Sequence, residues 1–134
     1  MELKNTFLKK KSSIKDAITI LNKFKCQIVL IVNEKYQLLG TVTDGDIRRS
    51  IAKGNNLDCP LFKIMNRNPI KINSNKGFQS IQRLMKINSI LQIPEVDKDN
   101  KILKMHYWNS KINLKKKKNY FFIMAGGIGK RLLP

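Results

Sequence analysis

The first half of the chain carries one helical pattern followed by two strand patterns. Apolar residues recur at spacings of three and four over residues 14–24, which predicts an amphipathic helix with Ser12 or Ser13 as its N-cap. Residues 27–32, QIVLIV, form a continuous β-branched run that is typical of a buried strand. A polar turn leads from this run to a second apolar run at residues 38–43. The two runs therefore predict a β-hairpin.

A second helix and a proline-containing connector follow the hairpin. Asp44 favours a helix start because a carboxylate in the first turn complements the helix dipole, and Gly54 suits the position just after the last turn. Residues 55–69 contain Pro60 and Pro69, which interrupt regular structure. This segment is therefore predicted to be a connector with one short helical turn.

The same order of patterns returns 64 residues later without a gap. Residues 78–88 repeat the helical pattern, with Ser74 or Asn75 as the expected cap, and residues 91–96 and 101–108 repeat the two strand patterns. One such unit cannot easily bury both faces of its sheet, whereas two stacked copies can. The predicted fold class is therefore α/β (α+β): two βαββα-like units packed as a pseudo-two-fold pair, with a C-terminal strand and loop after them.

The formal net charge of +18 raises the alternative of a basic nucleic-acid-binding protein. Only five of the 27 basic residues are Arg, which is the better residue for bidentate phosphate and base contacts. The Lys residues are scattered, and the only true clusters, residues 9–11 and 115–118, fall in segments expected outside the core. Charge alone therefore favours a solvated surface over a nucleic-acid site.

Composition also bears on location, thiols and metals. No apolar stretch approaches the roughly 20 residues of a membrane span, and the first residues carry no secretory signal pattern. Cys26 and Cys59 lie far apart without a CxxC motif, so free thiols in a reducing cytoplasm are expected, although a disulfide stays open. The sole histidine, His106, has no set of metal-ligating neighbours, so no metal site is predicted.

Residues 40–51, GTVTDGDIRRSI, resemble the signature of a cystathionine-β-synthase (CBS) domain. The matching residues are Gly40, Val42, Thr43, Asp46, Ile47 and Arg48. The resemblance extends over about residues 5–111 as a CBS pair, with residues 65–72 leading into the second copy. It implies a module that requires no cofactor, binds an adenine nucleotide (AMP, ADP or ATP) as an effector, and regulates a neighbouring enzyme or transporter.

Three of the matching residues are the candidate nucleotide site. The Thr43 hydroxyl can donate to a phosphate at a helix start, and the Asp46 carboxylate suits both hydroxyls of a ribose. Gly40 permits a close backbone approach. The alternative is that Thr43 and Asp46 only cap the following helix.

The second copy departs from this pattern. At the offset of 64, Lys104, Tyr107 and Ser110 replace Gly40, Thr43 and Asp46 in turn. The ribose carboxylate and the small hydroxyl are both missing, so at most one site per pair is expected. Whether the second copy binds a ligand or serves only as scaffold stays open.

The end of the chain breaks the repeat. Residues 112–119 are predicted to be a basic linker, and residues 120–134 start with a strand pattern that enters a glycine-rich loop. The loop resembles the N-terminal signature of sugar-phosphate nucleotidyltransferases. The residues that would form its nucleoside-triphosphate loop are Ala125, Gly126, Gly127, Gly129 and Arg131. A complete catalytic domain would need about 200 further residues. The chain is therefore expected to be the regulatory part of a truncated, split or incompletely recorded enzyme, with no catalytic residues and no activity of its own.

The predicted organisation is a first CBS repeat over residues 1–57 and a second over residues 58–111. Apolar residues of the second repeat's helix, Leu84, Met85 and Ile87, are expected to remain available for a symmetric homodimer. Two alternatives stay open beside the nucleotide-binding module: a dimerisation or interaction module that binds no ligand, and a basic nucleic-acid-binding protein.

Overall fold

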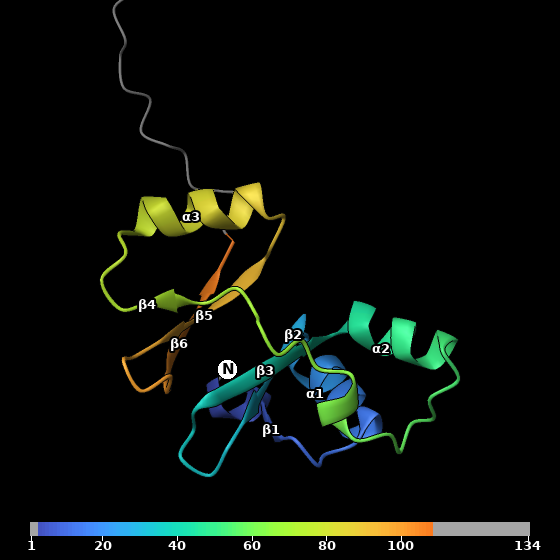
Figure 1. Ribbon diagram of the computed structural model, residues 1–134. Helices are drawn as coiled ribbons and strands as arrows, with labels where there is room; N and C mark the ends of the chain where they lie inside the picture. Colours follow the sequence, from blue (N-terminus) through green and yellow to red (C-terminus); the bar gives the residue numbers. More distant parts are fainter. Residues whose placement is uncertain (1–2, 109–134) are drawn as a thin grey trace, which may run out of the picture.

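A computed structural model describes residues 3–108, which form two three-stranded sheets and their helices (Figure 1). The linker expected at residues 112–119 and the nucleotidyltransferase-like segment at residues 120–134 lie outside the described residues. Among the described residues, no helix is long and apolar enough to cross a membrane. The α+β fold class predicted from the sequence is confirmed.

The first unit contains one sheet with the order β1-β2-β3, in which β1 is parallel and β3 antiparallel to β2. Its elements are η1 (Leu3–Thr6), β1 (Phe7–Lys9), α1 (Ile14–Phe24), β2 (Ile28–Val32), β3 (Leu38–Thr43) and α2 (Asp44–Ala52). The connector contains the single helical turn expected there, η2 (Leu61–Lys63). Gly54 has a φ of 89°, as expected for the residue that ends α2.

The second unit repeats this arrangement with the sheet order β4-β5-β6. Its elements are β4 (Ile72–Asn73), α3 (Phe78–Ile87), β5 (Gln92–Val96) and β6 (Ile102–Tyr107). The strand register repeats at an offset of 64: the pair Val32–Leu38 beside the bulge of the first sheet becomes Val96–Ile102 in the second. The repeat predicted from apolar positions is therefore confirmed at the level of backbone pairing.

Backbone conformation repeats with the same offset. Lys25 and Tyr36 have positive φ, and so do Ser89 and Asn100, which lie 64 residues later. Tyr36 and Asn100 occupy the two hairpin turns, where the left-handed conformation reverses the chain. The two turns also join the units: Leu38 N donates to Asn100 O at 2.8 Å, and Ile102 N donates to Tyr36 O at 3.2 Å. These reciprocal bonds follow the pseudo-two-fold relation of the units.

Helix caps agree with the sequence in one unit and differ in the other. Ser13 caps α1 in a capping box with Asp16, as the pattern predicts. The cap expected for α3 is wrong: Gly77 occupies that position without a side-chain bond. Ser74 donates its backbone N–H to Val96 O at 3.3 Å, which extends the pairing of β4 along β5 and keeps Ser74 out of the helix.

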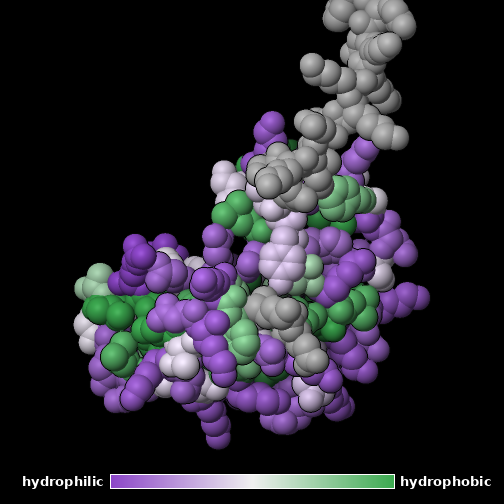
Figure 2. Space-filling model, turned by 180° about the vertical axis from the view of Figure 1, so that it is seen from behind, coloured by the Kyte–Doolittle hydropathy of each residue, from purple (hydrophilic) through white to green (hydrophobic). Residues whose placement is uncertain are grey.

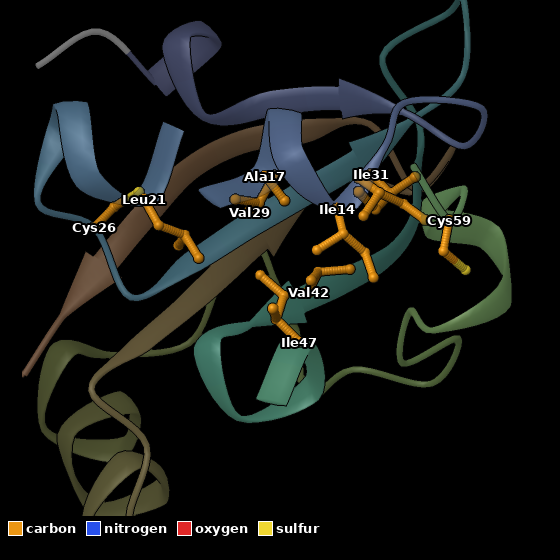
Figure 3. Packing of buried hydrophobic residues seen from close by; sticks show 10 residues of the cluster. Ile14, Ala17, Leu21, Cys26, Val29, Ile31, Val42, Ile47 and Cys59 are labelled. Carbon is orange, nitrogen blue, oxygen red and sulfur yellow. The ribbon is translucent and has the colours of Figure 1, made fainter. Parts of the chain in front are cut away.

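Three apolar clusters hold the structure together. The largest lies between the helices and the sheet of the first unit (Figure 3) and includes Ile14, Ala17, Val29, Val42 and Ile47. A second joins the units across Leu30, Leu38 and Val96, and a third lies under α3. Cys26 and Cys59 are free thiols buried in the first cluster.

The apolar residues of α3 that were expected at a dimer face differ in their exposure. Met85, expected at a dimer face, is fully buried in the core under α3, so this part of the expectation is wrong. Leu84 is half-buried, whereas Ile87 is 70% exposed. Met85 points inward because it lies one helical turn from the buried Ile81. Hydrophilic residues cover most of the face shown in Figure 2, and apolar residues gather there in separate patches.

Candidate functional site

A cleft of about 570 Å³ opens between the two units. One wall contains the end of α1 and the start of β2, including Gln27 and Ile28, and the opposite wall contains residues 89–92. Residues 25–28 become residues 89–92 at the offset of 64, so both units contribute the same segment. Gln27 N donates to Gln92 Oε1 at 3.3 Å across the cleft. The cleft therefore lies on the pseudo-two-fold axis of the pair.

The two units complete this cleft differently. The first unit adds the N-terminus of α2, residues 43–45. The equivalent of Thr43 in the second unit is Tyr107. Burial raises the pKa of the Tyr107 phenol, and the charge of a Cys26 thiolate nearby adds to the rise. Tyr107 is the last residue of β6, as Thr43 is of β3, so an aromatic ring replaces the small hydroxyl at the end of this strand.

Thr43 and Asp46 are brought together by a capping box. Asp46 Oδ2 accepts from Thr43 N at 2.8 Å and from Thr43 Oγ1 at 2.7 Å, and Asp46 N donates to Thr43 Oγ1 at 3.3 Å. Asp46 Oδ1 also accepts from Arg49 Nη2 at 2.6 Å. The capping alternative raised from the sequence is thus present, and Thr43, but not Asp46, is among the residues that line the cleft.

Gly40 has a packing role in β3. A Cβ at this position would lie 2.6 Å from Asn66 O and 3.1 Å from Met65 Sδ. The connector lies this close because Thr41 and Asn66 exchange two backbone hydrogen bonds, of 3.0 and 2.9 Å. Gly40 therefore allows the connector to pack on the sheet, and it does not line the cleft.

The start of α2 presents groups that suit an anion. The first N–H groups of a helix have no partner within the helix, and they carry the positive end of its dipole. A Cβ on Gly45 would lie 3.3 Å from Arg49 Nη1, so the Arg49 guanidinium lies over Gly45 at the edge of the cleft. Asp44 is paired with Arg48 at 2.5 Å. Sequence reasoning missed Gly45 and Arg49, and it also missed that residues 25–28 and 89–92 line a cleft. The offset of 64 relates these two segments, so the repeat was the signal that could have placed them on the axis.

One polar cluster elsewhere was also missed. Glu95 is 7% exposed, and its Oε2 lies 2.6 Å from His106 Nε2 and 3.3 Å from Lys104 Nζ. The hydrogen bond with His106 lowers the pKa of the Glu95 carboxyl. Glu95 replaces the buried Ile31 of the first unit, and His106 replaces Val42. No group of metal-ligating side chains occurs among residues 3–108.

Comparisons with known proteins agree with this architecture. Residues 3–53 match the model of the CBS domain. An uncharacterised protein of Rickettsia prowazekii is 37% identical over 92 residues, which cover 69% of this chain and 28% of that protein. Arabinose 5-phosphate isomerase GutQ of Salmonella typhi is 28% identical over 91 residues, with coverage of 68% and 28%. The chain spans about a quarter of the length of the curated relatives it matches.

Solved structures share this fold over three quarters of the chain. The CBS domain pair of protein MJ0100, in complex with 5-methylthioadenosine and S-adenosyl-L-methionine, is 25% identical with a TM-score of 0.66, covering 75% of this chain and 79% of that one. CBSX2 in complex with AMP is 20% identical with a TM-score of 0.65 and the same coverage. The CBS domain model thus matches residues 3–53, and the described residues share the fold of a CBS pair.

Proposed function

We propose that this chain is a regulatory CBS module that binds an adenine nucleotide, AMP, ADP or ATP, in the cleft between its two units. The cleft on the pseudo-two-fold axis carries the proposal. Its volume of about 570 Å³ lies within the range of roughly 300–1,000 Å³ typical of small-molecule sites. The ligands named for MJ0100 and CBSX2 share an adenosine group, which supports the same ligand class here.

The two residues of the capping box have different proposed roles: Thr43 lies on the side of the phosphate, and Asp46 lies on the side of the ribose. The first N–H groups of α2, at Asp44 and Gly45, and the Arg49 guanidinium bind the phosphate, since they gather positive potential at one helix start. The Thr43 hydroxyl joins them by turning its proton from Asp46 Oδ2 to a phosphate oxygen. Asp46, which directly follows the lining residues 43–45, accepts from the ribose hydroxyls at the edge of the cleft. Asp46 Oδ1 accepts from Arg49 Nη2 at 2.6 Å, so a ribose hydroxyl bound to Asp46 competes with this bond and frees Arg49 for the phosphate.

Gly40 contributes indirectly in this proposal. It holds the connector against β3 and so fixes the strand that ends at Thr43. The second unit supplies the opposite wall, residues 89–92, and no second phosphate site, because Tyr107 stands where Thr43 stands in the first unit.

The enzyme under regulation is proposed to act on a sugar phosphate. Two observations support this class: GutQ is named an arabinose 5-phosphate isomerase, and residues 120–134 resemble the start of a sugar-phosphate nucleotidyltransferase. In the nucleotidyltransferase alternative, the triphosphate loop is made of Ala125, Gly126, Gly127, Gly129 and Arg131. In either alternative the CBS pair itself performs no catalysis, requires no cofactor and works in the cytoplasm.

The module is also proposed to form a homodimer. The observation that supports this is Ile87, which is 70% exposed on α3, with the half-buried Leu84 beside it on the same face, three residues earlier. The second candidate function, a dimerisation module that binds no ligand, rests on the same surface.

Calorimetric titration with AMP, ATP and S-adenosylmethionine tests the site. Asp46→Ala is compared with Asp16→Ala. The control removes the matching carboxylate of the α1 capping box, and Asp16 does not line the cleft. AMP or ATP should bind the wild type and Asp16→Ala alike, and Asp46→Ala should bind about tenfold or more weakly because a charge-assisted hydrogen bond is lost. At 100 times its dissociation constant the nucleotide should add about 2.7 kcal/mol of stability.

Three outcomes count against the proposal. Equal loss in both variants would show that only helix capping matters. Binding of S-adenosylmethionine alone would reassign the effector. Absence of binding by all three ligands would favour the dimerisation module.

A further inference from the structure

A second cavity, of about 510 Å³, lies on the first unit away from the nucleotide cleft. It is lined by Lys10, Lys11, Leu39, Phe62, Met65 and Arg67, none of which lines the cleft. Leu39 lies near the start of β3 and Thr43 is its last residue, so the two sites are separated by about 13 Å along the strand. The cavity therefore needs a separate explanation.

The walls of this cavity are fixed by the backbone. Phe62 N donates to Lys10 O at 3.0 Å, and Leu61 N donates to Ser12 O at 2.8 Å, which ties the segment after β1 to η2. Arg67 follows Asn66, which is bonded to Thr41 of β3 in both directions. Arg67 Nη2 also donates to Phe62 O at 3.4 Å. The cavity thus lies among elements held in place by hydrogen bonds, rather than on one flexible loop.

The lining combines cations with an apolar floor. Leu39, Met65 and the 38% exposed Phe62 supply apolar surface, while Lys10, Lys11 and Arg67 supply three positive charges. No carboxylate is among the lining residues, and no ion pair of the described residues involves these three cations. By contrast, the adjacent Lys9 pairs with Glu34 at 3.0 Å and donates to Asn33 O at 3.1 Å.

The strand register of the repeat does not require Lys10 and Lys11. At the offset of 64, Lys10 and Lys11 become Ser74 and Asn75, and the second unit keeps the same strand register without them. Clustered charges of one sign repel each other unless an anion lies between them. Lys10 and Lys11 are therefore a property of this cavity and not of the repeat.

We propose that this cavity binds a small phosphomonoester with an aromatic or apolar group. A phosphomonoester carries close to two negative charges at neutral pH, which matches a set of three cations, and Arg67 can bind two of its oxygens in parallel. Phe62, with Leu39 and Met65, receives the aromatic or apolar group. This site is independent of the proposed nucleotide cleft, and neither requires the other.

Phenyl phosphate is the probe, because it joins a phosphomonoester to a single aromatic ring. Chemical-shift titrations compare the wild type with Lys10→Ala/Lys11→Ala and with the control Lys9→Ala/Lys63→Ala, which removes two neighbouring charges outside the lining. Saturable binding is expected in the wild type, tighter than that of inorganic phosphate. Affinity should fall about tenfold or more in the test variant and less than twofold in the control. Phe62→Ser should lose the preference for phenyl phosphate over inorganic phosphate.

Several results would overturn the assignment. The first two are an absence of saturable binding and an equal loss of affinity in the test and control variants. The third is displacement of phenyl phosphate by AMP together with a loss of phenyl phosphate affinity in Asp46→Ala, which would place the probe in the cleft. Tighter binding of a random single-stranded RNA that depends on Lys10 and Lys11 would assign the cavity to nucleic acid instead.

Discussion

Replacing Gly40 by Ala tests whether this residue acts through packing or through a ligand. The added Cβ would lie 2.6 Å from Asn66 O, and ordinary contact begins at 3.4 Å, so the carbonyl must retreat by about 0.8 Å. That movement lengthens the two hydrogen bonds between Thr41 and Asn66, now 3.0 and 2.9 Å. Weakening of both bonds and local overpacking together should cost about 2 kcal/mol.

Thermal and urea unfolding measure this cost. A loss of about 2 kcal/mol should lower the Tm by on the order of 10 °C for a domain of this size. Gly77→Ala is the matched control, because no atom lies within 4 Å of the added Cβ and the φ of Gly77 is −62°. Because Gly77 is the N-cap of α3, where Gly is preferred over Ala, the control should cost at most about 1 kcal/mol.

Nucleotide binding separates the two interpretations of Gly40. If packing explains this residue, Gly40→Ala should lose stability and keep most of its affinity for AMP under conditions where it is folded. A Gly40→Ala protein as stable as Gly77→Ala but unable to bind nucleotide would refute the packing argument and place Gly40 in direct contact with the ligand.

Two further predictions concern the second unit. Glu95→Gln should destabilise the protein by about 1 kcal/mol at pH 7 because a buried charge-assisted bond to His106 is lost. Since the folded-state pKa of Glu95 lies below its ordinary value of 4.5, this contribution is complete above that value and fades as the pH falls through the lower folded pKa. Urea unfolding at pH 7 and pH 3 should therefore show a difference that shrinks in acid, and a constant difference would contradict the argument. Ile87→Lys should convert the proposed homodimer to a monomer in light scattering at micromolar concentration, and a monomeric wild type would rule out this interface.

The sequence determined the repeat and most of its elements. Continuous β-branched runs and helical spacing are local signals, so β2, β3, α1, α2, α3 and both hairpins were predicted close to their observed bounds. The offset of 64 extended the same signals to the second unit. Thr43 and Asp46 were also recognised together, because a capping box and a phosphate-binding helix start use the same residue types at the same spacing.

Only the tertiary structure decided what those elements do together. β1 and β4 contain three and two residues, too few to show a period, and they exist because β2 and β5 offer parallel partners. The sequence placed Gly40 in the candidate nucleotide site, where it would permit a close backbone approach. In the structure, the group close to Gly40 is the carbonyl of Asn66, which lies in the connector 26 residues later in the sequence. Both cavities likewise join segments far apart in the chain, and a pattern read along one strand or helix contains no information on which distant segment will face it.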